Sequence, residues 1–534
     1  MTIKNILLFL FCIVVGGLIS LWLGQDIGFD INNYHLYIPY AFLHGRLFTD
    51  IIAAGPVHTF FNPLPDIPFF LLFYYLNDWP KVTGFLLGGY YGIFLFALFK
   101  WVPLVLQGNR CQDKCLQWIT VFFAATGMAA FLQVGHSSNE ELMGFLAVLA
   151  AYLIFRGTDE KLHFNLKNIL WAAFWASLAT GLKHTAAPAA IGIGTACLFL
   201  LIKNKSSYKQ YFYVIGAALG GFLLTDGYFL WEKYDKLQNP LFPFFNHIFH
   251  SPFYPNEALA NSSYVPDGWK EWLFLPFLRV TWFNNWDYVV DFRLILGLTS
   301  VVLLIIGGLF YIKKRPLSKT YALLLCFFIG TYVPWVILFG NLRYGIFLEV
   351  LSSLLFVFLL RRFLSAKFVC VIVVGILFLS AFTPFPRFPR TPYKHKNILF
   401  SQSVSMEKNS LVVVVGHISF VIPFLDPSAK YIGGVILTKE FLDTDQGTLN
   451  YVCPLQYLDY QHFFNPRIYE TIQNHQGAIY ILMPSLSWLM SEPFWKTYGL
   501  TPPTSCQLLQ TNIRPNRIYP GDIALCRVEK IVKN

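Results

Sequence analysis

The segment from Ile169 to Ile202, ILWAAFWASLATGLKHTAAPAAIGIGTACLFLLI, decides the fold class. It is apolar almost throughout, and Lys183 and His184 interrupt it near its middle. A helix needs about 20 apolar residues to cross the hydrocarbon core of a bilayer, where every backbone polar group must be satisfied internally. The segment therefore predicts two membrane-spanning helices joined by a short turn, with Lys183 and His184 at one membrane face.

The composition extends this interpretation to most of the chain. Of the 534 residues, 55% are hydrophobic, 18% are aromatic and only 13% are charged, which is far from the average of soluble proteins. The net charge of +11 is distributed as short Lys and Arg clusters between apolar runs, a pattern that argues against nucleic acid as a partner. The nine cysteines form no C-x-x-C pair and no Cys/His spacing suited to zinc.

About eleven apolar runs of spanning length are expected within residues 1–384. Residues 4–23 could also be a secretory signal, but they lack a convincing small-residue cleavage site, so we expect a permanent first helix. Residues 66–77 are too short to span comfortably, and we expect them to be re-entrant or interfacial. The expected spans lie near 4–23, 82–106, 115–133, 141–155, 168–183, 186–202, 211–230, 293–312, 320–339, 346–360 and 368–384.

The basic clusters predict the orientation of these helices. Short loops rich in Lys and Arg stay in the cytoplasm, so the N-terminus is expected inside, with 24–81, 231–292 and everything after 384 outside. The aromatic region 231–292 is expected to be an ordered loop on the membrane surface. This topology predicts a multi-pass protein of the cell (inner) membrane. The cytoplasmic clusters are Arg110 and Lys114; Arg156, Lys161 and Lys167; Lys203, Lys205 and Lys209; Lys313, Lys314, Arg315 and Lys319; and Arg361, Arg362 and Lys367.

Residues 385–534 have the composition of a water-exposed α/β domain. Leu411–Val415 and Ala478–Met483 are short β-branched runs bounded by turn residues, and a last strand is expected near Ile523–Val528. The topology predicts that this domain is extracytoplasmic. Cys506 and Cys526 lie in two candidate strands, so we expect a disulfide between them in an oxidising compartment.

Ionisable groups next to apolar spans are costly and are candidates for function. On one face, cations could hold a lipid-linked phosphate, while a carboxylate could deprotonate an acceptor or bind a metal. Glu140 and Glu141 could instead cap a helix that starts after Ser138 and Asn139, and Lys183 could snorkel to the interface. The groups that the charge rule places outside are Asp26, Asp30, Asn139, Glu140, Glu141, Lys183, His184, Asp226 and Arg343.

The first outer loop resembles a known motif. Asp30-Ile-Asn-Asn-Tyr34-His35, running on through Ala41 to Gly45, is similar to the segment after the first helix of GT-C membrane glycosyltransferases, in particular the lipid A aminoarabinose transferases and protein O-mannosyltransferases. There an Asp-x-x-x-Tyr sequence leads an interfacial helix ending in Gly. The resemblance implies that Asp30 is the catalytic acid of the motif.

Later segments resemble the same superfamily in the same order. Asn139-Glu140-Glu141 is similar to an acid-bearing helix start, Gly181-Leu182-Lys183 to a segment whose Lys contacts donor phosphate, and Arg343-Tyr344 to an Arg-Tyr pair before a late helix. Two positions differ from the relatives: Asn33 replaces an Arg, and Asn62-Pro63 stands where Lys-Pro is common. These departures leave the sugar open. The implied substrate-binding residues are Tyr34, His35, Glu140, Glu141, His184 and Tyr344, beside the phosphate-binding Lys183 and Arg343.

The resulting expectation is an inverting, GT-C-like glycosyltransferase that takes a sugar from a polyprenyl-phosphate donor to a glycan, lipid or protein acceptor. Lys183 and Arg343 would line one cavity with Asp30, open to membrane lipids; a divalent metal is left open as a cofactor. A transporter or lipid flippase is the main alternative, but it predicts polar residues at mid-membrane depth and a repeat in two halves. A third alternative, an outer domain on a helical anchor, leaves the charged rim unexplained.

Overall fold

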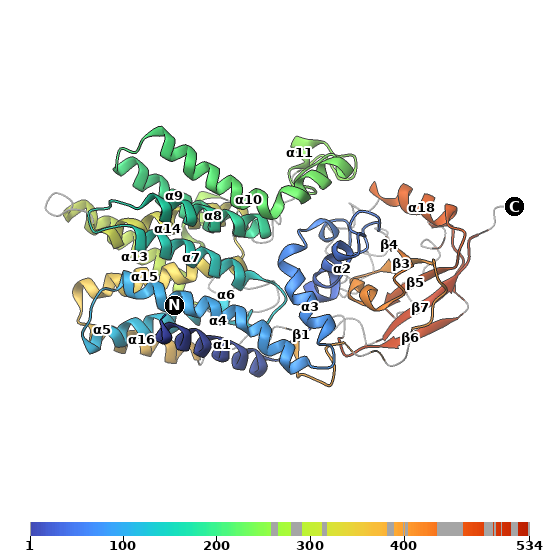
Figure 1. The fold of residues 1–534 in the computed structure, drawn as a ribbon, viewed down its shortest axis with the longest axis horizontal. Helices are drawn as coiled ribbons and strands as arrows, with labels where there is room; N and C mark the ends of the chain where they lie inside the picture. The colour runs from blue at the N-terminus through green and yellow to red at the C-terminus, as the bar shows by residue number, and fades with distance from the viewer. Residues whose placement is uncertain are drawn as a thin grey trace. The chain divides into compact units, whose positions relative to one another are not determined.

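The computed structural model divides the chain into two compact units, which are described separately (Figure 1). The first unit comprises Met1–Leu23, Gly84–Tyr228 and Ala260–Phe388, and the second comprises Gly24–Thr83, Phe229–Leu259 and Pro389–Asn534. The structure describes residues 2–257, 265–266, 268–278, 291–311, 318–381, 389–398, 400, 404–434, 463–484, 495, 498–503, 505–513 and 522–531.

The first unit is built from helices, and the expected apolar runs fall on helices, but the run expected at 115–133 is divided: α5 ends at Ala125, and the short α6 (Met128–Phe131) begins after Gly127. Among the residues that the structure describes, five helices are long and apolar enough to cross a membrane: α1, α4, α10, α14, and α9 with the turn before it. They agree with a helical membrane protein, while the full number of spans stays a prediction. The helices are α1 Ile3–Leu23, α4 Pro80–Val105, α5 Cys111–Ala125, α6 Met128–Phe131, α7 Glu140–Gly157, α8 Leu166–Leu182, α9 Ala187–Lys203, α10 Tyr208–Leu237, α12 Trp269–Leu278, α13 Arg293–Tyr311, α14 Lys319–Leu338, α15 Ile346–Phe363 and α16 Ala366–Ala381.

Glycines allow the closest helix contacts in this unit. A Cβ on Gly16 of α1 would lie 2.2 Å from the carbonyl oxygen of Gly88 in α4, and one on Gly92 would lie 2.6 Å from the Cα of Ile13. Small residues let helix backbones approach closely where lipid gives no hydrophobic driving force between helices.

The expected basic loop residues Lys313, Lys314 and Arg315 lie outside the described residues.

The second unit contains a five-stranded mixed sheet with the order β4-β3-β5-β7-β6. Strands β4, β3 and β5 are parallel, and β7 and β6 continue the sheet antiparallel. The expected strands near 411–415, 478–483 and 523–528 are confirmed. The strands are β3 Leu411–Val415, β4 Lys430–Gly434, β5 Ile479–Pro484, β6 Cys506–Gln510 and β7 Asp522–Val528, with the helix α18 at Asn465–Asn474.

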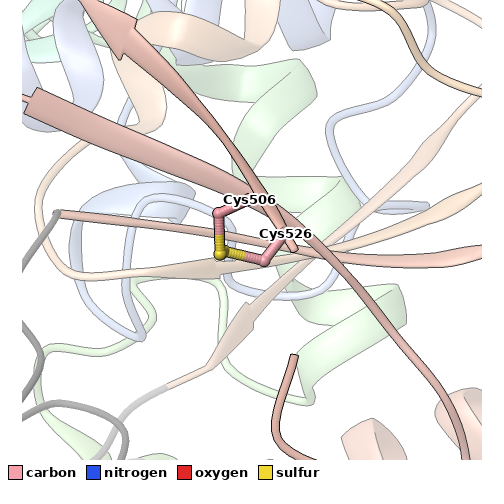
Figure 2. The surroundings of a disulfide bond; sticks show 2 residues. All are labelled: Cys506 and Cys526. Atoms are coloured by element: carbon pink, nitrogen blue, oxygen red, sulfur yellow. A yellow bond between two sulfur atoms is a disulfide. The ribbon is translucent and has the colours of Figure 1, made fainter. Parts of the chain in front are cut away.

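The expected disulfide is present in this sheet. Cys506 of β6 lies directly opposite Cys526 of β7, and their sulfur atoms are bonded (Figure 2). A covalent link across two antiparallel strands holds their register, because a slip of one residue would reverse the faces of every side chain.

The first outer loop belongs to this second unit as part of the same fold. Its strand β1 (Gln25–Asp26) pairs with β2 (Arg390–Thr391), and Ile51 forms a parallel bridge to Ile432 of β4. The backbone N–H of Gly433 donates to the carbonyl of Ile51 over 2.7 Å. The loop also contains the π-helical turn η1 Ile31–His35, α2 Tyr37–Leu43, η2 His58–Phe60, η3 Leu64–Asp66 and α3 Ile67–Tyr75.

The short helix α3 covers most of the segment that was expected to be re-entrant or interfacial. Its 9 residues extend over roughly 14 Å, about half of the hydrocarbon thickness. The length excludes a full span, whereas the position of the helix at a membrane surface stays a prediction.

A buried ionic contact holds the loop to the sheet. The Asp50 side chain is only 1% exposed, and its oxygens accept hydrogen bonds from Arg46 Nη2 at 2.8 Å, Arg46 Nε at 3.0 Å and Tyr37 Oη at 3.1 Å. They also accept one from the backbone N–H of Tyr431 in β4 at 3.1 Å. Arg46 in turn donates to the carbonyl of Ala429. These contacts, which we call the Asp50 latch, attach the loop to strand β4.

We expect Asp50→Ala to destabilise the second unit by about 3–5 kcal/mol, because removing one partner of a buried ion pair leaves the other uncompensated. The measurement is the unfolding free energy of the purified full chain in denaturant. Asp235→Ala removes a half-exposed carboxylate paired with Lys236 and should cost less than about 1 kcal/mol. Equal effects of the two substitutions would show that the latch does not stabilise the fold.

Candidate functional site

Three charged side chains meet in the first unit at helix ends that lie far apart in the sequence. Lys183 follows the last residue of α8, and its Nζ lies 2.6 Å from Glu140 Oε1 at the start of α7. Arg343, in the turn η5 (Leu342–Tyr344) before α15, places its Nε 3.3 Å from the same oxygen. We call Glu140, Lys183 and Arg343 the ion triad. From sequence, all three belong to the charged groups expected on one membrane face; that placement, a shared cavity with Asp30 and their roles stay predictions.

Burial differs within the ion triad. The Glu140 side chain is 3% exposed, while those of Lys183 and Arg343 are 20% and 14% exposed. A buried carboxylate therefore anchors two cations that keep part of their surface accessible. Asn139, at the N-cap of α7, is left-handed with φ of 61° and makes no side-chain capping hydrogen bond. The ion pairs of Glu140 therefore explain this segment better than helix capping does.

A polar network holds the ion triad in place. Lys183 Nζ donates to the backbone carbonyl of Ser138 at 2.5 Å, and Ser138 Oγ donates to Gln133 Oε1 at 2.6 Å. Gln133 Nε2 donates to the carbonyls of Ala129 and Arg343. Because each member fixes the next, the cations are held in position before any ligand arrives.

The remaining predicted residues of this unit lie beside the same helix ends. His184, in the turn η4 (His184–Ala186), pairs its Nε2 with Asp226 Oδ2 of α10 at 2.8 Å. Asp226 is fully buried, so its contact orients the ring of His184, whose implied substrate-binding role stays a prediction. Glu141 is also buried, and Tyr344 contacts Phe339 edge to face at 5.6 Å.

Asp30, Tyr34 and His35 belong to the second unit, where the turn η1 places all three. Asp30 is 8% exposed and stands immediately before the turn. The Nδ1 of His35 lies 3.9 Å from Asp66 Oδ1, and both residues are buried. Tyr34 stacks on His58 with ring centroids 4.9 Å apart. The acid of the predicted motif is therefore set among aromatic and imidazole rings.

Burial lowers the pKa of His58 to about 4, against which the charge of Asp30 acts to raise it. Part of the ring remains accessible, but the surrounding Tyr34, Phe29 and Phe61 rings remove most of its hydration. Desolvation favours the neutral imidazole, so His58 is uncharged at neutral pH.

Sequence reasoning missed His58, Asp66 and His417 as neighbours of the motif. His58 and Asp66 are in the same loop, and a preference for carboxylates and histidines beside Asp30 could have drawn attention to them. His417 contacts Phe29 at 4.6 Å but comes from the sheet region, so no local pattern could have found it.

The sequence left open whether the protein binds a divalent metal ion. Among the described residues, no three or more His, Cys, Asp and Glu side chains are grouped to hold a metal ion. The acids and histidines instead occur in pairs, such as His184 with Asp226 and His35 with Asp66. The described side chains thus offer no preformed metal centre.

We expect the ion triad to show strong thermodynamic coupling. Glu140→Gln and Lys183→Ala should each destabilise the protein, and the double variant should be more stable than the sum predicts by about 1–3 kcal/mol, because the two side chains interact directly. Unfolding free energies of the four proteins in the cycle measure this. The pair Glu140→Gln and Lys161→Ala is the control. Additive effects for Lys183 would rule out the ion pair.

We expect His58 to make the stability of the protein depend on pH. The unfolded state binds a proton near pH 6.5 and the folded state only near pH 4, so the contribution is complete above pH 6.5 and is lost as pH falls toward 4. Water near the ring reduces the effect to about 2 kcal/mol. Unfolding free energies of wild type and His58→Phe are measured at pH 7.5, 6 and 5. Relative to that of His58→Phe, the unfolding free energy of wild type should fall as the pH falls across this range. A constant difference would mean that His58 does not titrate as described.

No model of a known protein family matches this chain, and no curated protein matches it. The geometry of the ion triad and of the Asp30 surroundings therefore carries the functional argument.

Proposed function

We propose that this protein is an integral membrane glycosyltransferase that moves a sugar from a polyprenyl-phosphate donor to an acceptor hydroxyl on the outer face of the membrane. The observation that carries the proposal is the ion triad, in which two accessible cations share one buried carboxylate. The GT-C resemblance of the segments around Asp30, Glu140, Lys183 and Arg343 supports it further.

The charge of the ion triad suits a phosphate ligand. Two cations and one carboxylate leave an excess of one positive charge, and both cations have exposed surface. Arg and Lys donate charge-assisted hydrogen bonds to phosphate oxygens, and Arg does so in a bidentate manner. Glu140 holds the two cations together against their mutual repulsion, so little reorganisation is needed when the phosphate binds.

In the proposed reaction Asp30 is the base. Its carboxylate takes the proton of the acceptor hydroxyl, and the hydroxyl oxygen bonds to the anomeric carbon of the sugar. The bond from that carbon to the phosphate oxygen breaks, and its electron pair leaves with polyprenyl phosphate. Direct displacement inverts the anomeric configuration. Lys183 and Arg343 stabilise the charge that develops on the departing phosphate.

The proposed location is the cell membrane, with about eleven spans, a cytoplasmic N-terminus and the sheet-bearing region outside. The alternation of basic loops supports this topology. The disulfide between Cys506 and Cys526 supports an oxidising compartment for the sheet.

The test uses the full chain in lipid nanodiscs and two ligands, polyprenyl phosphate and unphosphorylated polyprenol. Wild type should bind the phosphate in preference to the alcohol. Lys183→Ala and Arg343→Ala should each weaken phosphate binding by about tenfold or more, since a hydrogen bond to a charged group contributes roughly 1.5–3 kcal/mol. Lys203→Ala, at the opposite end of α9, should bind within twofold of wild type.

Transfer is then measured with a panel of polyprenyl-phosphate sugars in membranes that contain the native acceptor. Asp30→Asn should retain phosphate binding and lose transfer by at least about 100-fold, because general base catalysis contributes on this scale. Activity of Asp30→Asn within a few-fold of wild type would remove Asp30 as the base. Equal binding of polyprenol and polyprenyl phosphate would overturn the transferase proposal, and movement of the intact lipid across the bilayer without transfer would favour a flippase.

A further inference from the structure

Phe29 is unusual among the residues around Asp30. It directly precedes the acid and is 39% exposed although it is large and apolar. Its ring lies between two imidazoles, with centroids 5.6 Å from His58 and 4.6 Å from His417. Both histidines are only partly buried. Folding alone does not require an exposed phenyl ring between two imidazoles, so this arrangement is a candidate for ligand binding.

The ring contacts continue away from Phe29. His58 stacks on Tyr34 and meets the ring of Phe61 at 5.3 Å, and Phe61 stacks on Phe244 at 6.4 Å with an interplanar angle of 10°. Phe61 and Phe244 are also partly exposed. We call this set the ring platform; its members are Phe29, Tyr34, His58, Phe61, Phe244 and His417.

The sheet contributes to the ring platform at the position where α/β proteins bind ligands. After β3 the chain continues to β4 on one side, whereas β5 lies on the other side of β3. Ligands of open parallel sheets bind outside the carboxyl ends of strands at such a reversal. Gly416, directly after β3, has φ of 81° and lies near Pro484 at the end of β5. His417 follows at this reversal point.

The loop and the sheet are also packed together here. The turn η1 and helix α2 both contact η6 (Ser419–Phe424), the segment that follows His417. The turn after Asp30 and the segment that follows β3 are thus packed together within the second unit.

We propose that the ring platform binds a neutral sugar ring of the acceptor and that His417 hydrogen-bonds one of its hydroxyls, so that the sheet region selects the acceptor presented to Asp30. This inference rests on the proposed transferase function for the role of the bound sugar as acceptor. The binding itself can be tested without that function.

The chemistry of the ring platform favours a neutral sugar over other ligands. A sugar has apolar C–H faces that pack on aromatic rings and hydroxyl edges that hydrogen-bond to imidazoles. A hydrocarbon chain has no group that could hydrogen-bond an imidazole nitrogen. The set contains no Lys or Arg, His58 is neutral, and the adjacent Asp30 would repel an anion. A neutral polyhydroxylated ring offers both an apolar face for the aromatic rings and hydroxyls for the imidazoles.

The experiment measures binding of the full chain in nanodiscs to an array of neutral oligosaccharides and their sulfated and carboxylated counterparts. We expect wild type to bind one or more neutral glycans. Phe29→Leu, which keeps an apolar side chain but removes the ring, and His417→Asn should each weaken this binding by at least about tenfold. The matched controls Phe245→Leu, in the same unit, and His475→Asn, at the opposite edge of the sheet before β5, should bind within twofold of wild type.

The outcomes separate this inference from the transferase proposal. Three results would overturn the sugar-binding role of the ring platform but not the transferase proposal, provided that wild type binds polyprenyl phosphate. In the first two, wild type binds no neutral glycan or binds anionic glycans alone. In the third, Phe29→Leu and His417→Asn bind neutral glycans as well as wild type does. If wild type binds neutral glycans but not polyprenyl phosphate, and both variants lose the glycan binding, the ring platform is supported and the transferase proposal is overturned. If both hold, Phe29→Leu should raise the KM for acceptor at least tenfold without changing the Kd for polyprenyl phosphate.

Discussion

The Asp50 latch is the contact on which the arrangement of the second unit depends. One carboxylate, 1% exposed, accepts hydrogen bonds from Tyr37 and Arg46 of the first loop and from the backbone of Tyr431 in the sheet. A buried carboxylate is stable only when its oxygens are paired in this way. Because the donors come from both segments, the loop is held to β4 when the latch forms. The position of Asp30 relative to His417 follows from that attachment.

The ion triad uses the same principle for a different purpose. Glu140 is as enclosed as Asp50, but its cationic partners keep exposed surface. In the Asp50 latch the carboxylate accepts hydrogen bonds from donors of the loop and of the sheet, so the two segments are held together. In the ion triad one carboxylate is shared by two cations, which leaves one positive charge in excess within the triad. The difference lies in the ratio of charges and in the exposure of the cations, not in the types of residue.

Much of the helical architecture could be predicted from the sequence because hydropathy is a local property. The segment from Ile169 to Ile202 predicts two helices from its own hydropathy alone, and both are present. The positions of Glu140, Lys183 and Arg343 near helix ends could be inferred from the apolar runs, and the basic loops predict one common face for them. That both cations share Glu140 was not predictable, because it depends on the crossing of helices.

The association of the first loop with the sheet was beyond sequence reasoning for a related reason. The pairing of Ile51 with Ile432 is a backbone contact between segments far apart in the chain, and backbone hydrogen bonds leave no side-chain pattern to read. The narrow space at Gly433, where a Cβ would lie 2.2 Å from the carbonyl oxygen of Ile52, is equally invisible, because any turn can supply a reason for a glycine. His417 was missed as a direct consequence.

The neutral state of His58 links the packing of this unit to its proposed chemistry. A protonated imidazole beside Asp30 would stabilise the carboxylate and make it a weaker acceptor of protons. Burial among Tyr34, Phe29 and Phe61 keeps the pKa of His58 near 4, so that charge is withheld at neutral pH. In the proposed reaction, the same rings that pack against the acceptor sugar also keep a positive charge away from Asp30.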